Sequence, residues 1–210
     1  MKYTLVGKVM FSLLLITMIL SGCKDPTPKP DPAPGTDEPK VSIAEYLPLR
    51  EGNKWIYEGI GNEFASYTQE VIYEKDNSYQ VMVSSGTVTA NRYVVTDESI
   101  IHNYREHESY DNTNILDSPP NFDGTLLKLP LEVGNSWISG GNDCEIFSIN
   151  STVQVPAGTF TDCVVVKTTY KDSSNSSFQY YQKNVGLVKS EYVMENNEKI
   201  ESLLKEYTIR

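Results

Sequence analysis

Cysteine is the residue type in this chain whose reactivity is easiest to assign, because the first cysteine lies in a recognisable processing motif. Cys23 ends the run Leu20-Ser21-Gly22-Cys23, which matches the lipobox at which bacterial lipoproteins are cleaved. In that motif the cysteine sulfur forms a thioether with diacylglycerol, and cleavage before the cysteine makes it the new N-terminus. The motif therefore predicts lipidation of Cys23. Two or three acyl chains would hold the protein at a membrane, since each buried methylene contributes roughly 0.8 kcal/mol.

The residues on both sides of this motif are typical of an exported chain. Lys2 and Lys8 flank a basic start, and the uncharged apolar run from Val9 to Leu20 is too short to span a bilayer. We expect residues 1–22 to be a lipoprotein signal peptide. Residues 23–40 contain six prolines and no large apolar side chain, which favours an extended tether. An uncleaved anchor with an incidental cysteine is the alternative interpretation.

The other two cysteines, Cys144 and Cys163, form a candidate disulfide, because an exported domain with two cysteines can oxidise them. The alternative is that Cys163, in a Cys-Val-Val-Val run, is a small buried hydrophobic residue. Two cysteines without a nearby pair of histidines do not form a zinc site.

The only histidines are His102 and His107, and acidic residues flank the second. On a regular strand, side chains five residues apart lie on opposite faces, so one strand cannot aim both rings at one metal ion. A loop could bring them together, but a solvated polar stretch is the expected alternative. We predict no metal site.

Motifs for other chemistry are incomplete. Ser84-Ser85-Gly86 is expected to be a turn, and the chain contains no nucleophile elbow around a serine. The segment 111–114 (DNTN) resembles the start of a calcium loop but lacks the glycine and the distal glutamate. There is no phosphate loop or dinucleotide fingerprint. The sequence thus predicts no catalytic residue, no cofactor and no enzymatic activity.

The tyrosines are the only set of aromatic residues that could indicate a binding surface. Aromatic surfaces bind sugars and peptides, but tyrosine is also a good strand residue, and we expect the structural role. Those on expected strands are Tyr57, Tyr67, Tyr73, Tyr79, Tyr93, Tyr170, Tyr180, Tyr181 and Tyr192.

The charge balance argues against two classes of partner. Without Lys2 and Lys8, 16 basic side chains face 28 acidic ones, a net charge of −12 with histidine neutral. This composition argues against nucleic acid and against direct binding to anionic lipid.

An internal repeat is the second informative feature. Residues 47–56 (LPLREGNKWI) match residues 129–138 (LPLEVGNSWI) at an offset of 82, including both tryptophans. Gly-Asn is expected to form a turn through positive φ, and the tryptophan to start a strand and point inward. The pattern continues from residues 70–83 to 152–165, and then at an offset of 87. We expect one duplicated β domain over residues 41–210, with halves at about 45–124 and 125–210.

The expected elements are short antiparallel strands joined by polar turns, which indicates an all-β fold. Residues 199–207 carry apolar side chains at helical spacing, but the turn at 195–197 favours a closing strand. Residues 105–124 are expected to be a long polar connection. We predict that the two halves pack as one sandwich or as an open half-barrel, because about 80 residues form a small core alone.

These motifs resemble a family of uncharacterised bacterial lipoproteins. The matching pieces are Tyr46-Leu47-Pro48-Leu49 with Gly52-Asn53-Lys54-Trp55, then Val155-Pro156-Ala157-Gly158-Thr159-Phe160, and Val185-Gly186-Leu187-Val188. The resemblance covers residues 43–209 and implies an exported all-β domain behind a lipobox. It carries over no catalytic residue. By analogy, the open half-barrel would be similar to the lipoprotein-carrier fold.

The expected function follows from the predicted location of the protein, because the sequence contains no catalytic motif. We expect a lipid-anchored protein on the extracytoplasmic face of the cell membrane, at the cell surface or in the periplasm. Its β domain would be a non-catalytic binding or accessory module for a protein, glycan or small molecule. The alternatives are a carrier or chaperone for an apolar ligand inside a curved sheet and an envelope hydrolase.

Overall fold

The computed structural model describes residues 41–210. The predicted signal peptide (1–22), the cleavage motif with Cys23, and the tether (23–40) lie outside the described residues. Among residues 41–210, no helix is long and apolar enough to cross a membrane.

The described chain consists of strands and two short 3-10 helices. In order they are η1 (Ile43–Tyr46), β1 (Lys54–Ile60), η2 (Glu63–Ala65), β2 (Tyr67–Lys75), β3 (Ser78–Ser85), β4 (Thr87–Val95), β5 (Ser99–His107), β6 (Gly124–Lys128), β7 (Ser136–Ser139), β8 (Asn142–Val155), β9 (Gly158–Thr169), β10 (Ser176–Gln182), β11 (Gly186–Val193) and β12 (Lys199–Thr208).

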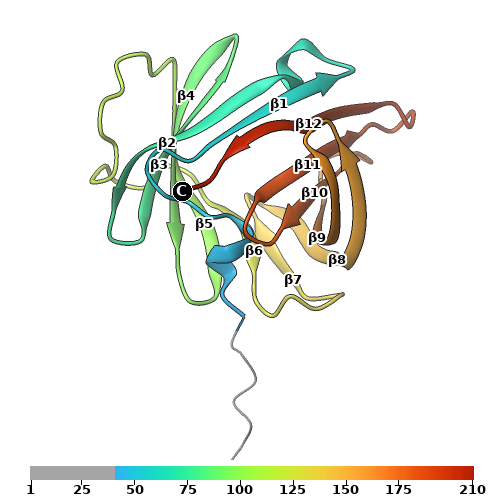
Figure 1. Cartoon of the computed structure of the whole chain (residues 1–210). Helices are drawn as coiled ribbons and strands as arrows, with labels where there is room; N and C mark the ends of the chain where they lie inside the picture. Colours follow the sequence, from blue (N-terminus) through green and yellow to red (C-terminus); the bar gives the residue numbers. More distant parts are fainter. Residues whose placement is uncertain (1–40) are drawn as a thin grey trace, which may run out of the picture. The chain divides into compact units, whose positions relative to one another are not determined.

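All twelve strands of residues 41–210 belong to one antiparallel sheet, in the order β6-β5-β4-β3-β2-β1-β12-β11-β10-β9-β8-β7. The first and last strands pair with each other, so the two free edges are β6 and β7 in the middle of the chain (Figure 1). These edges meet through side chains: the backbone N–H of Thr125 donates to Ser139 Oγ at 2.8 Å, and Trp137 Nε1 donates to the carbonyl of Thr125 at 3.0 Å. The sheet is therefore a nearly closed barrel. This confirms the antiparallel all-β fold and selects the curved sheet over the sandwich.

The segment with helical spacing near the C-terminus is a strand, as expected. β12 pairs with β1 on one side and with β11 on the other. Leu204 is completely buried and Ser202 is nearly so, both on the inner face. Because β12 is paired on both sides, its backbone N–H and C=O groups are hydrogen-bonded without forming a helix.

The two Gly-Asn turns adopt the same local structure. Gly52 and Gly134 have φ of +84° and +89°, as predicted for glycine in a tight turn. The asparagines do not share the positive φ that was expected of them. Instead, Asn53 Nδ2 donates to the carbonyl of Pro48 at 2.7 Å, and Asn135 Nδ2 donates to the carbonyl of Pro130 at 2.8 Å. Each asparagine therefore closes its turn with its side-chain amide.

β2 and β8, to which the two turns are hydrogen-bonded, differ in length. Gly52 donates its N–H to Val71 on β2, whereas Gly134 donates to Ile146 on β8, a separation of 75 positions rather than 82. β8 has 14 residues against nine in β2, and its pairing with β9 shifts register three times. Extra residues are thus accommodated in β8 as bulges.

One end of the barrel interior is packed with apolar side chains. Trp55 is 1% exposed and donates through Nε1 to the carbonyl of Val185 at 2.7 Å. Completely buried side chains around it include Ile100, Leu127, Ile146 and Leu204. Trp137 also points inward, so both tryptophans occupy the interior as expected.

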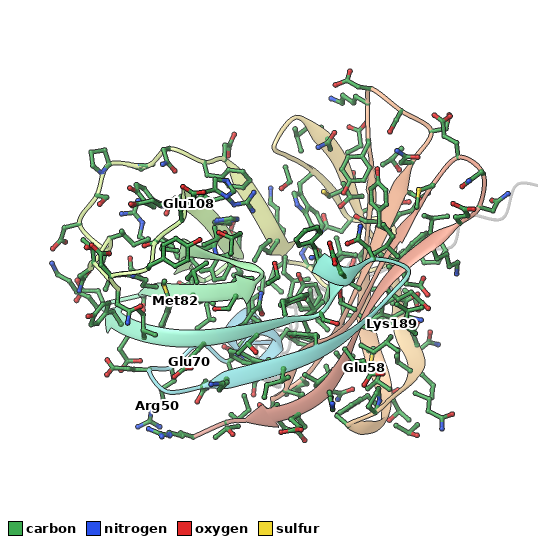
Figure 2. All side chains as sticks on the ribbon, turned by 90° about the horizontal axis from the view of Figure 1, so that it is seen from above. Arg50, Glu58, Glu70, Met82, Glu108 and Lys189 are labelled. Carbon is green, nitrogen blue, oxygen red and sulfur yellow. The ribbon has the colours of Figure 1, made fainter. Side chains whose placement is uncertain are left out.

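The outer face of β3, β4 and β5 is covered by the chain between β5 and β6. Ile115 packs on Met82 and Ala90, and Figure 2 labels Met82 together with Glu108 at the start of this covering loop. Arg92 is buried beneath the loop, where its Nη1 donates to the carbonyls of Leu116 and Ser118 at 2.8 and 2.6 Å. The long polar connection predicted at 105–124 begins instead after His107, and it is a packed cover.

Candidate functional site

Two adjoining cavities open at the end of the barrel interior away from Trp55, where β1 ends and β12 begins. Their volumes are about 390 and 370 Å³, and Tyr170 and Gln179 line both. We call the two together the inner pocket. Inward-facing residues of several strands form its wall, including His102, Arg105, Thr168, Ser177, Tyr192 and Ser202. The barrel interior is thus apolar around Trp55 and mainly polar at its opposite, open end.

A β-bulge places His102 and Arg105 on the same wall. His102 pairs with Tyr93 and Arg105 pairs with Asn91, with the register shift falling between them. Tyr93 and Asn91 are two residues apart on β4, so both face inward. The extra residue on β5 compensates for the odd spacing of His102 and Arg105, which would otherwise lie on opposite faces.

His102 is a neutral side chain at the base of the inner pocket. It is 3% exposed, and its ring centroid lies 4.9 Å from that of Tyr93 and 4.3 Å from that of Phe122. Burial, and then the charge of Arg105, lowers the pKa of His102 to about 4. Nε2 lies 3.0 Å from the carbonyl oxygen of Tyr104. Because that oxygen can only accept, Nε2 carries the hydrogen and Nδ1 is a hydrogen-bond acceptor.

Arg105 lies above the ring of Phe122, with 4.4 Å between the guanidinium carbon and the ring centroid. Its Nε donates to Asn91 Oδ1 at 3.3 Å. Phe122 reaches this position because its own N–H donates to the carbonyl of Asn103 and because Asn121 pairs with the backbone of Arg105. The end of the covering loop therefore forms part of the pocket wall.

Cys144 lines the inner pocket, and the candidate disulfide with Cys163 is not formed. Both cysteines are buried free thiols. Cys144 pairs across the ladder with Thr168, five residues along β9 from Cys163, which is on the order of 16 Å at strand rise. A disulfide requires Cα atoms within about 7 Å. The prediction failed because the cysteines occupy different positions along adjacent strands.

The tyrosines divide between core and pocket. Tyr57, Tyr93 and Tyr181 are buried, and the hydroxyl of Tyr57 donates to the carbonyl of Leu187 at 2.8 Å. These have the structural role expected from the sequence. Tyr170 and Tyr192 line the inner pocket instead, with their ring centroids 5.7 Å apart.

The face assignment of the two histidines was wrong. His107 pairs with Thr89, which lies on the same side of β4 as Asn91 and Tyr93, so the bulge puts both histidines on one face. They remain separated by about 13 Å along the strand, and His107 is exposed while His102 is buried. No group of three His, Cys, Asp or Glu side chains within residues 41–210 is arranged to hold a metal ion.

The other weak motifs serve local structure. Asp111 accepts the N–H of Thr113 at 3.1 Å, and this bond lowers the pKa of the Asp111 carboxyl. Asn114 accepts the N–H of Leu116 at 2.9 Å. Residues 84–86 end β3 and turn into β4, with Gly86 at φ +73°. Asp111 and Asn114 therefore stabilise the covering loop rather than face a calcium ion.

A group of charges on the outer face is an ion-pair network. Lys189 Nζ lies 2.7 Å from Glu191 and 2.8 Å from Glu201, and Lys199 approaches Glu191 at 3.6 Å. Figure 2 labels Lys189 on β11 near Glu58 on β1. Glu191 also lines the smaller cavity of the inner pocket, where Lys189 and Lys199 balance its charge.

Sequence reasoning missed the residues that matter most in the inner pocket. Arg105 was assigned to a polar connection, and Phe122 and Gln179 carried no motif. Their convergence depends on the bulge in β5 and on the closure of the barrel, neither of which has a local sequence signature. The alternation of β10, with Ser177, Gln179 and Tyr181 on one face, was the one usable signal.

Comparison with known proteins gives distant structural likenesses. No protein-family model and no curated protein matches the chain. One similar solved structure is described as a putative lipoprotein from Parabacteroides distasonis ATCC 8503, with 15% identity, a TM-score of 0.44, and coverage of 78% of this chain and 98% of that one. Another is described as a putative exported protein with a YmcC-like fold from Bacteroides fragilis NCTC 9343, with 14% identity, a TM-score of 0.42, and coverage of 77% and 97%. At this similarity, the function of the chain is argued from its own residues.

Proposed function

We propose that this protein is a membrane-anchored extracytoplasmic lipoprotein whose β domain binds a small polar ligand in the inner pocket without chemical conversion. The lipobox at Cys23 supports the address. The observation that carries the binding role is the pocket wall itself: hydrogen-bonding side chains from several strands, Arg105 among them, converge on one opening, beside the aromatic rings of Phe122, Tyr170 and Tyr192. Concave sites of several hundred Å³ with a few convergent polar groups are typical ligand sites.

The groups in the pocket are poorly suited to catalysis. A catalytic cysteine reacts as the thiolate, which a neighbouring imidazolium commonly stabilises. Burial raises the pKa of the Cys144 thiol and lowers that of His102, so both groups favour their neutral forms at neutral pH. No aspartate or glutamate lines the cavity that holds them. These properties favour a binding module over an envelope hydrolase.

The packing of the interior favours a polar ligand over an apolar one. The part of the barrel that would shelter an acyl chain is filled by Trp55, Tyr57, Leu127, Ile146 and Leu204. The open end presents hydroxyl, amide and imidazole groups, which an apolar ligand would leave without hydrogen-bond partners. A carrier for an apolar molecule is therefore the weaker hypothesis.

The binding role can be tested with a variant that fills the pocket. Thr168 lines the pocket on β9, and the adjacent Thr169 is exposed on the opposite face. A panel of monosaccharides and their acidic derivatives would be titrated against ¹⁵N-labelled protein at millimolar concentration. We expect shift changes around Thr168, Tyr170 and Gln179 that are lost in Thr168→Phe and kept in Thr169→Phe. Shifts that persist in Thr168→Phe, or no shift with any compound, would count against the proposal.

The anchor has a separate test. Mass spectrometry of the membrane fraction should find an acylated Cys23 at the N-terminus, and Cys23→Ala should leave the chain unprocessed or release it from the membrane. Recovery of unmodified full-length wild-type chain from the cytoplasm would contradict the proposed address. This experiment is independent of what the pocket binds.

A further inference from the structure

The larger cavity of the inner pocket has a positive bias in an acidic protein. The chain has 28 acidic and 18 basic side chains, yet no carboxylate lines this cavity, while the guanidinium of Arg105 does. The smaller cavity is lined by one carboxylate, Glu191, which is paired with Lys189 and Lys199. Arg105 therefore gives the larger cavity a local preference for anions.

The guanidinium of Arg105 has unused hydrogen-bonding capacity. Within residues 41–210, its side chain makes one hydrogen bond, from Nε to Asn91, and no ion pair. The four N–H groups on Nη1 and Nη2 are therefore left for a ligand. The Phe122 ring supports one face of the guanidinium, which restricts its orientation at little cost in hydrogen bonds.

Arg92, on the opposite face of the neighbouring strand, shows the contrasting use of an arginine. Its Nε donates to Asn103, and its Nη1 donates to three backbone carbonyls, those of Ile115, Leu116 and Ser118. The guanidinium of Arg92 therefore donates hydrogen bonds mainly to the covering loop. The guanidinium of Arg105 donates none to that loop.

The neighbours of Arg105 do not supply a counter-ion by titrating. Tyr93 stays protonated, because burial raises its pKa to about 12 despite the opposing effect of Arg105. His102 stays neutral and contributes Nδ1 as an acceptor for a hydroxyl group. Neither side chain supplies a negative charge that would balance Arg105.

We propose that the ligand of the inner pocket is an acidic sugar-sized molecule whose oxyanion, a carboxylate, sulfate or phosphate, is bound by Arg105. This inference rests on the proposed binding role of the pocket. The guanidinium fork matches two oxygens of such a group. Thr168, Gln179 and His102 Nδ1 would then bind the hydroxyl groups of the ligand body.

The test compares matched ligands in the full-length processed protein. Galactose, galacturonate, galactose 6-sulfate and galactose 6-phosphate would be titrated by calorimetry and by NMR, with the Arg105 Nε–Hε signal as a local probe. We expect at least one acidic ligand to bind about tenfold or more tightly than galactose, with weaker binding at high salt. The three acidic probes distinguish carboxylate, sulfate and phosphate.

Variants locate the effect. Arg105→Gln should remove the advantage of the acidic ligand, and Arg105→Lys should restore only part of it. Arg50→Gln, a substitution of an exposed arginine outside the pocket, should change nothing. If galactose and every acidic probe bind the wild-type pocket with equal affinity, the anion preference is wrong, but the proposed binding role of the pocket is retained. If none of them shifts pocket signals, both the anion inference and this ligand class fail.

Discussion

At the scale of single residues, a comparison of Gly186 with Gly134 distinguishes the cost of backbone strain from the cost of overpacking. Gly186 has φ +104°, and a Cβ there would lie 3.2 Å from Trp55 Nε1 and 3.4 Å from Leu47. Gly134 has φ +89°, and nothing lies within 4 Å of its Cβ position. Both substitutions to alanine force an L residue into positive φ, but only one also crowds the buried tryptophan.

We expect Gly186→Ala to destabilise the domain by about 3 kcal/mol, the sum of strain and overpacking. Gly134→Ala should cost only about 1 kcal/mol. Urea unfolding followed by tryptophan fluorescence would measure both free energies. Equal losses in the two variants would mean that Gly186 serves only the backbone conformation.

His102 predicts a stability change with pH. Its folded pKa of about 4 is below the 6.5 of a free histidine, so the unfolded chain binds more protons between these values. Stability should therefore fall as the pH drops from about 6.5 to about 4, by at most about 3 kcal/mol. Unfolding free energies across this range should show a shallower slope in His102→Gln than in the wild type. Parallel slopes in wild type and His102→Gln would refute the assignment.

At the scale of elements, the covering loop between β5 and β6 depends on one buried cation. Arg92 is 5% exposed and is solvated by loop carbonyls rather than by a carboxylate. Its removal leaves these carbonyls without a donor, which is costly when they are buried.

Arg92→Gln should destabilise the protein by about 2–4 kcal/mol and release the loop before the barrel. Hydrogen exchange should then accelerate at Ile115, whose N–H donates to Gln80 Oε1, and at Leu116. Arg50→Gln is the control on an exposed turn. If exchange in the loop stays slow in Arg92→Gln, Arg92 does not hold the loop in place.

The elements themselves were largely predictable, whereas the pocket was not. Alternation of valine and tyrosine, with turns at Gly-Asn and at residues 195–197, was enough to predict an antiparallel sheet and a closing strand at 199–207. The bulges are different, because β5 and β8 gain residues without any glycine or proline to mark them. Since one extra residue reverses the face of every later side chain, the inward position of Arg105 could not be read from spacing. The disulfide prediction failed for a related reason, because it depended on register along β8 and β9.

At the scale of the whole molecule, the barrel is closed by backbone pairing everywhere except between β6 and β7. There, the indole of Trp137 bridges to Thr125 and replaces a regular ladder. The equivalent indole of Trp55 bonds deep in the core to Val185. The two tryptophans therefore support different kinds of contact.

Trp137→Phe keeps an aromatic side chain but removes the indole donor and some buried volume, so it should cost about 2 kcal/mol and loosen the contact between β6 and β7. Amide exchange should increase at Thr125 and along β7, while β1 and β12 keep their protection. Trp55→Phe is the comparison, and it should not increase exchange selectively at Thr125. A uniform rise in exchange across the sheet in Trp137→Phe would show that this contact has no local role.

The pairing of β1 with β12 has a consequence for the order in which the chain is made. Every other pairing in the sheet joins strands that are neighbours in sequence, but the second edge of β1 pairs with β12, residues 199–208. During synthesis, β1 therefore keeps one unpaired edge until β12 has followed. Unpaired edges invite association with other chains. A chain without residues 199–208 would expose β1 on one side and β11 on the other, so β12 protects both strands from association with other chains.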